Sequence, residues 1–294
     1  MKKIGLVILS ILAAGSAMAQ WPGPRSRVVT DTIHSEVLGA DRAYTVYLPA
    51  NFDTDKNGRF PVLYLLHGMG GINRSWFDDQ RAGDVMDQLT ASGEAVPMVI
   101  VSPNAGGNVM EGHWNGYFNM PGWNYEDFFY TEFLPYIEKT YRCGGSKGQR
   151  AVAGLSMGGG GATSYAQRHP DMFSSAYAMS ALMDIPDFPQ AQNPAPSPDG
   201  DKMGLLTKAV KDLSCVKYVQ NADENTKNAM RTVKWFVDCG DDDFLFDRNI
   251  EFVQAMHQAW IPVEFRVRDG GHTNEYWHSA LYSALPFASR NFDR

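Results

Sequence analysis

Arg150-Ala-Val-Ala-Gly-Leu-Ser-Met-Gly-Gly159 combines a short apolar run with a serine that stands between glycines two positions to either side. The run predicts a buried strand, and residues 162–169 predict a helix that Pro170 ends. A strand, a G-x-S-x-G turn and a helix in this order are typical of a nucleophile elbow, whose tight turn strains the backbone of Ser156. The hydroxyl would lie at a helix N-terminus, where backbone amides favour a developing negative charge. The alternative is an ordinary glycine-rich turn that carries a serine by chance.

A serine nucleophile needs a histidine base and a carboxylate that orients the base, and both are expected after later strands of the same sheet. His272 follows the last predicted strand on a Gly-Gly turn, ahead of the final predicted helix. Asp241, Asp242 and Asp243 follow the penultimate predicted strand. We therefore predict Ser156 and His272 as catalytic residues, while position alone leaves the acid open among the three aspartates.

The negative oxygen of a tetrahedral intermediate needs backbone N–H donors, which form an oxyanion hole. One donor is expected from Met157, the residue after the nucleophile. The other is expected from Met69, in the glycine-rich loop 67–71 that follows a buried strand. Glycines in this loop would let the backbone approach a substrate closely. The alternative is a plain turn between a strand and a helix.

Apolar runs alternate with segments of helical periodicity along most of the chain. This alternation predicts an α/β fold, with a mostly parallel, doubly wound sheet, an antiparallel N-terminal edge and helices on both faces. One domain is expected from 20 to 294, with an aromatic loop at 104–124 and a lid-like insertion at about 183–231. The predicted strands are 27–37, 43–48, 60–66, 97–101, 150–154, 174–179, 233–237 and 263–267, and the predicted helices are 82–92, 125–141, 162–169, 247–260 and 275–288.

The first 19 residues predict a secretory signal peptide, because two lysines precede a short apolar run and the sequence Ala17-Met18-Ala19. Cleavage after Ala19 would leave residues 20–294 as a secreted or periplasmic protein without a membrane anchor. The apolar run is too short to span a bilayer comfortably. The full chain has a formal net charge of −7 and no basic patch, which argues against nucleic-acid binding.

Three cysteines are present, so at most one internal disulfide can form. A bridge between Cys143 and Cys215 is compatible with an oxidising compartment, whereas Cys239 is expected as a buried strand residue. The spacings match no zinc pattern. We predict neither a metal nor an organic cofactor, although the aspartates at 241–243 could also form a chance cation site.

Several short motifs, taken together, resemble one family, the putative esterase family of α/β-hydrolases. That family includes esterase D-type enzymes, the antigen 85 mycolyltransferases, and the feruloyl and acetylxylan esterases of carbohydrate esterase family 1. The matching pieces are Tyr44-Thr-Val-Tyr-Leu-Pro49, Leu63-Tyr-Leu-Leu-His-Gly68, the Trp76 region, Gly154-Leu-Ser-Met-Gly-Gly159, Cys239-Gly240 to Phe244-Leu245, and Gly271-His272 to Tyr276-Trp277.

The resemblance implies an α/β-hydrolase fold and two-step acyl transfer by a serine, histidine and aspartate without a cofactor. The family's Cys-Gly-x-x-Asp-Phe-Leu pattern selects Asp243 as the acid, with Asp242 second. Its Gly-Gly-His-x-x-x-x-Trp pattern supports His272 and places Trp277 near the site. The implied partner is an acylated polysaccharide or oligosaccharide, from which the enzyme would remove feruloyl or acetyl groups, as on plant xylan.

Aromatic and amide side chains crowd the 104–124 loop, and this composition suits a sugar or a phenolic acyl group. Core packing is the alternative for each of them. Rival functions are a general short-chain carboxylesterase, a thioester hydrolase, an antigen 85-like acyltransferase and a non-catalytic carbohydrate-binding protein. The substrate-binding candidates are His67, Trp114, Tyr117, Trp123 and Trp277.

Overall fold

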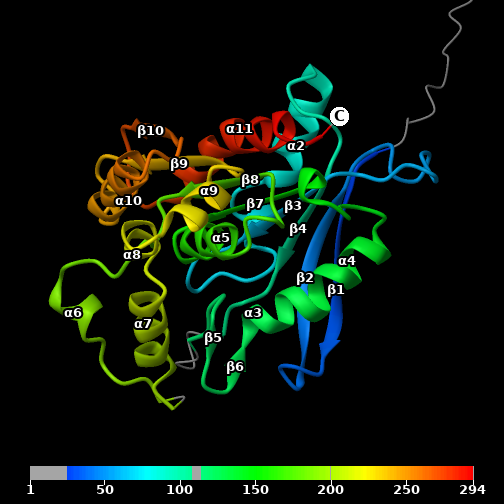
Figure 1. The fold of residues 1–294 in the computed structure, drawn as a ribbon. Coiled ribbons are helices and arrows are strands. Elements are labelled where there is room, and N and C mark those ends of the chain that lie inside the picture. The colour runs from blue at the N-terminus through cyan, green and yellow to red at the C-terminus, as the bar shows by residue number, and fades with distance from the viewer. Residues whose placement is uncertain (1–24, 108–113, 199, 294) are drawn as a thin grey trace, which may run out of the picture.

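The computed structural model describes residues 25–107, 114–198 and 200–293 (Figure 1). The predicted signal peptide, residues 1–19, and part of the aromatic loop, residues 108–113, lie outside these ranges. Within the described ranges, no helix combines the length and the apolar character needed to cross a bilayer.

An eight-stranded sheet forms the centre of the protein, in the order β1-β2-β4-β3-β7-β8-β9-β10 (Figure 1). β2 pairs antiparallel with β1 and β4, and the other pairs are parallel. The predicted sheet with its antiparallel N-terminal edge is thereby confirmed. The strands are β1 (Arg27–Ser35), β2 (Ala40–Leu48), β3 (Val62–Leu66), β4 (Val99–Pro103), β7 (Arg150–Leu155), β8 (Ser175–Met179), β9 (Lys234–Gly240) and β10 (Glu264–Arg268), with β5 (Asn119–Met120) and β6 (Trp123–Asn124) as a separate hairpin.

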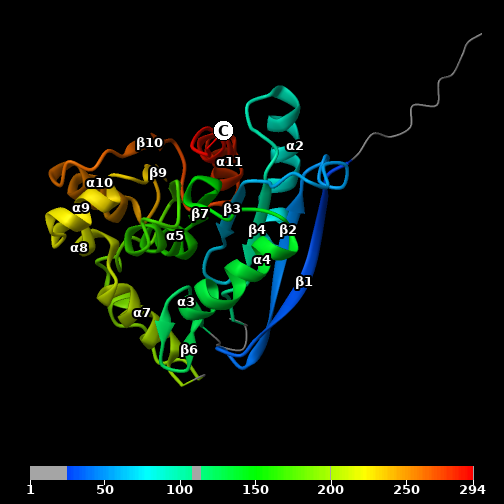
Figure 2. The ribbon, with the colours of Figure 1, turned by 45° about the vertical axis from the view of Figure 1, so that its right-hand side comes forward.

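Helices cover both faces of the sheet, because side chains along each buried strand alternate between two apolar layers. In β3, Tyr64 belongs to one buried cluster, and Leu63 and Leu65 belong to the other. α2 and α11 bury their apolar sides in the second cluster and lie on the same side of the sheet (Figures 1 and 2). The helices are α1 (Ser75–Asp78), α2 (Ala82–Ser92), α3 (Tyr125–Phe128), α4 (Leu134–Thr140), α5 (Met157–Arg168), α6 (Pro189–Gln192), α7 (Lys202–Asp212), α8 (Cys215–Gln220), α9 (Glu224–Met230), α10 (Phe246–Gln258) and α11 (Asn274–Arg290).

The predicted helix at 125–141 contains a wider turn in its middle. α3 passes into a π-helical turn, Phe129–Phe133, and this turn passes into α4. Pro135 near the start of α4 cannot donate a backbone hydrogen bond, so the regular ladder is already interrupted there. The apolar periodicity that predicts one helix is unaffected, because the wider turn keeps Phe129 and Phe133 buried.

The three cysteines are free and buried. The Sγ atom of Cys143 lies 3.9 Å from the carbonyl oxygen of Ile137, whereas the Sγ atom of Cys215 lies 3.6 Å from that of Gly160. The bridge between Cys143 and Cys215, which the sequence leaves open, is therefore not formed. Cys239 is buried in β9, as predicted.

A long connection leaves the sheet between β8 and β9, and it contains the predicted insertion at about 183–231. It forms four short helices, α6 to α9, of which α6 and α7 lie away from the sheet at one end of the molecule (Figure 1). Its first part, from residue 181 to 192, runs close to the carboxyl ends of the central strands and contributes to the site described below.

Candidate active site

Ser156 occupies the tight turn between β7 and α5. Its backbone has a φ of 53° and a ψ of −121°, a conformation that is costly for a residue with a side chain and must be held by its surroundings. A Cβ atom on Gly154 would collide with the carbonyl of Gly158, and one on Gly158 would collide with the carbonyl of Leu66. The glycines of the motif are therefore required by the close approach of strand and helix.

Three backbone hydrogen bonds hold this turn in place. The N–H of Ser156 donates to the carbonyl oxygen of Met179 in β8 over 2.9 Å. The carbonyl oxygen of Ser156 accepts from the N–H groups of Gly160 at 3.1 Å and Leu182 at 2.9 Å. The serine is thus fixed both to its own helix and to the chain that leaves β8.

His272 lies between a hydroxyl and a carboxylate. Its Nε2 atom is 2.9 Å from the Oγ atom of Ser156, and its Nδ1 atom is 2.9 Å and 3.0 Å from the two carboxylate oxygens of Asp243. The side chain of Asp243 is fully buried, whereas 19% of the His272 side chain is exposed. These three residues are far apart in the sequence, and hydrogen bonds connect them from the buried carboxylate of Asp243 through the imidazole to the hydroxyl of Ser156.

The structure separates Asp243 from the other two aspartates of its group. The N–H of Leu245 donates to Oδ1 of Asp243 over 2.8 Å and fixes the carboxylate. Asp241 and Asp242 are exposed, and Oδ1 of Asp241 accepts a hydrogen bond from Gly270 at 3.2 Å. Asp243, the choice that the family pattern favours, is therefore the carboxylate in contact with the histidine.

Two aromatic rings flank the imidazole of His272. The ring of Phe244 lies 4.6 Å from it, and the ring of Trp277 lies 4.8 Å from it in an edge-to-face arrangement, measured between centroids. Trp277 is only 8% exposed, so it acts mainly as a wall against the histidine. Packing on both sides limits the rotation of the imidazole.

His67 is buried and bonded to the backbone through both ring nitrogens. Its Nδ1 atom is 2.8 Å from the carbonyl oxygen of Gly68, and its Nε2 atom accepts from the N–H of Ala105 at 3.1 Å. This pattern requires the neutral ring with the proton on Nδ1. Burial lowers the pKa of His67 to about 4, and nearby Arg42 adds to the lowering. His67 therefore supports the loop rather than offering a free nitrogen to a substrate.

The bonds of His67 also orient the peptide that carries the Met69 N–H. The carbonyl oxygen of Gly68 accepts from His67 and from the N–H of Gly71 at 3.1 Å. Because the C=O and N–H of a trans peptide point in opposite directions, the N–H of Met69 points away from these bonds. Met157 is the first residue of α5, where helix N–H groups have no intrahelical partner. Met69 lines the same pockets as Ser156, and Met157 follows Ser156 directly in the chain, so both N–H groups remain candidates for the oxyanion hole.

Two pockets meet at Ser156, His272 and Met69. The first, of about 290 Å³, has a wall in which polar and apolar surface are about equal, and we call it the polar pocket because it is more polar than the second. The second, of about 400 Å³, has a largely apolar wall, and most of its residues belong to the 181–207 segment and the loop after Asp243. The polar wall also includes Ser75, Asp79, Gln80, Asn274 and Trp277, and the apolar wall includes Leu182, Ile185, Pro186, Phe188, Pro194, Met203, Phe244 and Leu245.

Residues 35–288 match the family described as "Putative esterase". The chain belongs to this family. It is also similar to a solved ferulic acid esterase, with 61% identity and a TM-score of 0.86 over 91% of this chain and 99% of that one. In enzyme class, it is a carboxylic ester hydrolase.

Two further relatives of this esterase are more distant. An endo-1,4-beta-xylanase/feruloyl esterase of Xylanibacter ruminicola is 29% identical over 254 residues, which is 85% of this chain and 30% of that protein. The chain thus spans about a third of the length of this curated relative. A ferulic acid esterase of Anaeromyces mucronatus, solved with ferulic acid, has a TM-score of 0.70 at 19% identity, covering 92% of this chain and 93% of that one, and so indicates a shared fold.

The described part of the aromatic loop contributes to the core more than to the pockets. Tyr117 is fully buried and its hydroxyl donates to the carbonyl oxygen of His67 at 3.0 Å. Trp123 is 7% exposed, donates to the carbonyl oxygen of Gly116 and stacks on Tyr125. Trp114 is half-buried, and none of these three aromatics lines the two described pockets. The structure therefore corrects the expectation that Tyr117 and Trp123 contact a substrate.

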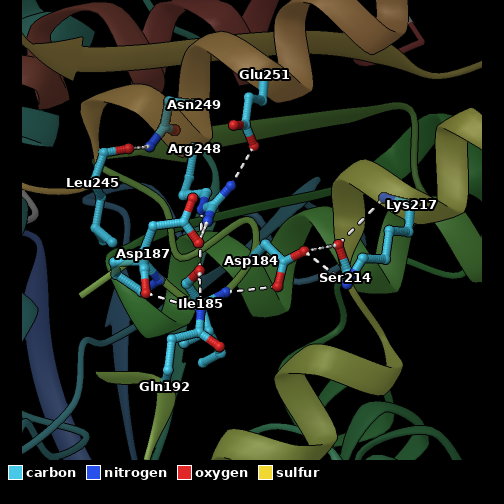
Figure 3. A network of polar contacts seen from close by, with 11 residues as sticks. Asp184, Ile185, Asp187, Gln192, Ser214, Lys217, Leu245, Arg248, Asn249 and Glu251 are labelled. Atoms are coloured by element: carbon cyan, nitrogen blue, oxygen red, sulfur yellow. Dashed lines mark hydrogen bonds and ion pairs between the residues drawn. The ribbon is translucent and has the colours of Figure 1, made fainter. Parts of the chain in front are cut away.

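Most of the apolar pocket wall lies in the segment where a lid-like insertion is predicted, although the sequence does not indicate which of its residues line the pocket. A network of polar contacts holds this wall in place (Figure 3). The guanidinium of Arg248 on α10 donates to the carbonyl oxygen of Ile185 at 3.0 Å and pairs with Asp187 and Glu251. The carboxylate of Asp184 accepts from the N–H of Ile185 at 2.7 Å. The wall segment is thus fixed by charged groups behind it while its apolar side chains face the pocket.

Asn249, the next residue on α10, joins this wall to the loop of the acid. Its Oδ1 atom accepts from the N–H of Ala181 at 3.2 Å, and its Nδ2 atom donates at 2.9 Å to the carbonyl oxygens of Ala181 and Leu245. The residue has no exposed surface. One buried amide therefore connects the chain next to Ser156 with the chain next to Asp243.

Within the described ranges, one group of acidic side chains could hold a cation. It consists of Asp241, Asp242 and Asp269, and all three are exposed. Exposed carboxylates often cluster without an ion, and none of these side chains contacts His272. The arrangement at Ser156 requires no metal to activate the hydroxyl.

Proposed function

We propose that this esterase cleaves aromatic acyl esters of the ferulate type by means of Ser156, His272 and Asp243. The observation that carries the proposal is the connected chain of hydrogen bonds from Asp243 through His272 to the Oγ atom of Ser156, next to an apolar pocket of about 400 Å³. The similarity to a ferulic acid esterase at 61% identity supports the choice of acyl group.

The proposed reaction begins when the Oγ atom of Ser156 attacks the ester carbonyl carbon while Nε2 of His272 takes the hydroxyl proton. The carbonyl oxygen becomes negative and accepts hydrogen bonds from the N–H groups of Met69 and Met157. His272 then gives its proton to the departing alcohol, which leaves an acyl group on the serine. Water, deprotonated by His272, releases the acid and restores the hydroxyl.

Asp243 supports both steps through the histidine. Its carboxylate accepts the Nδ1 proton of His272, which leaves Nε2 free to take the proton of the serine. It also stabilises the imidazolium that forms while the proton is on the histidine. Because the carboxylate is closed to solvent and held by Leu245, it needs no rearrangement during the reaction.

The apolar pocket suits a large aromatic acyl group better than an acetyl group. Phe188, Met203 and Phe244 offer the apolar contact that a phenylpropenoyl ring gains on leaving water. An acetyl group would leave most of this volume unused. We therefore place ferulate-type esters ahead of acetylxylan as the substrate.

We further propose that the ester is carried by a plant cell-wall polysaccharide such as xylan, and that the protein meets it outside the cytoplasm. The printed function of the Xylanibacter ruminicola relative, which joins a xylanase to a feruloyl esterase, supports the first part. The N-terminal sequence pattern supports the second. Sequencing the N-terminus of the exported protein would test the expected start at Gln20.

The direct test uses the purified protein beside its Ser156→Ala variant. Each is incubated with methyl ferulate, feruloylated arabinoxylan and acetylated xylan, and released ferulate and acetate are quantified. We expect ferulate from the unmodified protein and none above background from the variant. Acetate release without ferulate release would refute the proposed acyl group, and turnover that survives in Ser156→Ala would refute the nucleophile.

A further inference from the structure

The polar pocket also includes Ser156 in its wall, and the proposed acyl site in the apolar pocket leaves it unused. An ester carbonyl carbon bound at the Oγ atom carries two branches, the acyl chain and the alcohol. The two pockets share Ser156 and His272, so each can take one branch of the same ester. If the acyl chain lies in the apolar pocket, as the proposed function holds, the alcohol lies in the polar one.

Polar groups of complementary kinds line this pocket. The carboxylate of Asp79 is exposed and is a hydrogen-bond acceptor. Asn274 is exposed at the start of α11, where its Oδ1 atom accepts from Nε2 of Gln80 at 2.6 Å and its amide N–H₂ group is left to donate outward. The hydroxyl of Ser75 adds a group that can do both. An alcohol with several hydroxyl groups matches such a wall, whereas an alkyl chain would bury these groups without partners.

The pocket wall also includes two polar atoms without a partner among the described residues. They are the Oε1 atom of Gln80 and the Nε1 atom of Trp277, an acceptor and a donor, and both are closed to solvent. Because both atoms are closed to solvent, they offer no contact to a ligand as the wall stands, and the hydroxyl-binding character of the pocket rests on the exposed groups of Asp79 and Asn274.

The same wall is connected to the proposed base. The hydrogen bond from Gln80 to Asn274 ties the end of α1 to a residue two positions after His272. The carbonyl oxygen of Gln80 lies 2.7 Å from Nδ1 of His278, one turn further along α11. Because His272 lines the same pocket as Asp79 and Asn274, a ligand that fills this pocket contacts the wall that carries the proposed base.

We propose that the polar pocket is an alcohol subsite that binds the sugar residue carrying the ester, with Asp79 and Asn274 as its specificity determinants. This rests on the proposed function, because it assigns the second branch of the same ester. Asp79 accepts hydrogen bonds from sugar hydroxyls, and the amide N–H₂ group of Asn274 donates to them. The enzyme then favours feruloyl sugars over feruloyl esters of simple alcohols.

The experiment compares two esters with the same acyl group, 5-O-feruloyl arabinose and methyl ferulate. Because both give the same acyl-enzyme, the ratio of their kcat/KM values reports binding of the alcohol branch. The variants are Asp79→Ala and Asn274→Asp, of which the second keeps the Oδ1 acceptor for Gln80 and removes the donor. Glu275→Ala, an exposed acidic residue next to Asn274 that does not line the pocket, is the control.

We expect the unmodified enzyme to prefer the sugar ester, and each subsite variant to lower the ratio about tenfold, the size of one lost hydrogen bond to a charged or amide group. Glu275→Ala should keep the ratio. If the ratio of kcat/KM values is unchanged in both variants, including by an equal loss on both esters, the subsite is overturned and the proposed function stands. Failure of the unmodified enzyme to cleave either ester would overturn the proposed function and the subsite with it.

Discussion

Replacing Asn249 with leucine should destabilise the protein and slow the reaction, because one buried amide holds two parts of the site together. Leucine has a similar volume but no polar atoms. The N–H of Ala181 would lose its hydrogen bond inside the protein, whereas the carbonyl oxygens of Ala181 and Leu245 keep other donors, Met183 and the backbone N–H of residue 249. The change therefore leaves one orphaned buried donor and removes two further bonds.

The magnitude follows from these contacts. A buried donor without a partner costs about 2 kcal/mol, and each further lost hydrogen bond costs about 0.5 kcal/mol when its acceptor keeps another donor. The free energy of unfolding should thus fall by about 3 kcal/mol, a large part of the 5–15 kcal/mol typical of a domain. Since Leu245 also holds the carboxylate of Asp243, kcat on methyl ferulate should fall about tenfold with a smaller change in KM.

Urea unfolding and steady-state kinetics would measure both effects in the same preparation. Gln254→Leu, on the exposed side of the same helix, is the matched control and should change neither by much. If the free energy of unfolding falls by less than about 1 kcal/mol relative to this control, the stability assigned to the hydrogen bonds of Asn249 is refuted. Full stability loss with unchanged kcat would refute the link between Asn249 and the carboxylate.

Three further predictions concern single residues. The pKa of His67 is lowered to about 4 from an ordinary 6.5, so as pH falls the unfolded state binds a proton before the folded state does. The stability that His67 contributes is therefore fully present above about pH 6.5, and the free energy of unfolding falls by about 2 kcal/mol between about pH 7 and pH 4.5. Urea unfolding at several pH values should show this loss, and His67→Gln should remove it. Phe244→Ala should lower kcat/KM for methyl ferulate about tenfold more than for methyl acetate, because it removes apolar contact from the larger pocket; equal losses on both esters would place the ring outside the acyl site. Asp243→Asn should lower kcat by a factor of about 10³ or more, whereas Asp242→Asn should leave it within about twofold; the reverse order would reassign the acid.

The parts of the site that could be predicted from the sequence are those with a fixed local geometry. Strand and helix approach too closely for a Cβ atom at positions 154 and 158, so glycine is required there and the elbow at Ser156 can be recognised in the sequence. His272 is marked by its place after the last strand. The choice of Asp243 among three neighbouring aspartates depended on the family pattern, because position along the chain does not reveal which carboxylate is buried.

The remaining parts depend on contacts that composition does not encode. Aromatic residues suit a core as well as a pocket, and Tyr117 and Trp123 lie in the core because neighbouring backbone carbonyls accept their polar hydrogens. Phe188 belongs to a Pro- and Asp-rich stretch without periodicity, so nothing in its local sequence indicates a pocket wall. Phe244 and Leu245 follow the acid directly in the family pattern, but that pattern does not mark either residue as part of a pocket wall.

The way in which α10 holds the pocket wall bears on how acyl preference can change over evolution or by design. Arg248 and Asn249 bind the wall through main-chain atoms of Ile185 and Ala181. Any residue at these two positions would provide the same atoms, except proline at 181, which has no backbone N–H. The side chains that line the pocket are consequently free to vary without loosening the segment. Acyl selectivity can thus drift by substitution at the pocket face while the nucleophile, base and acid stay in register, so libraries for altered selectivity should randomise Leu182, Ile185 and Phe188 and keep α10 constant.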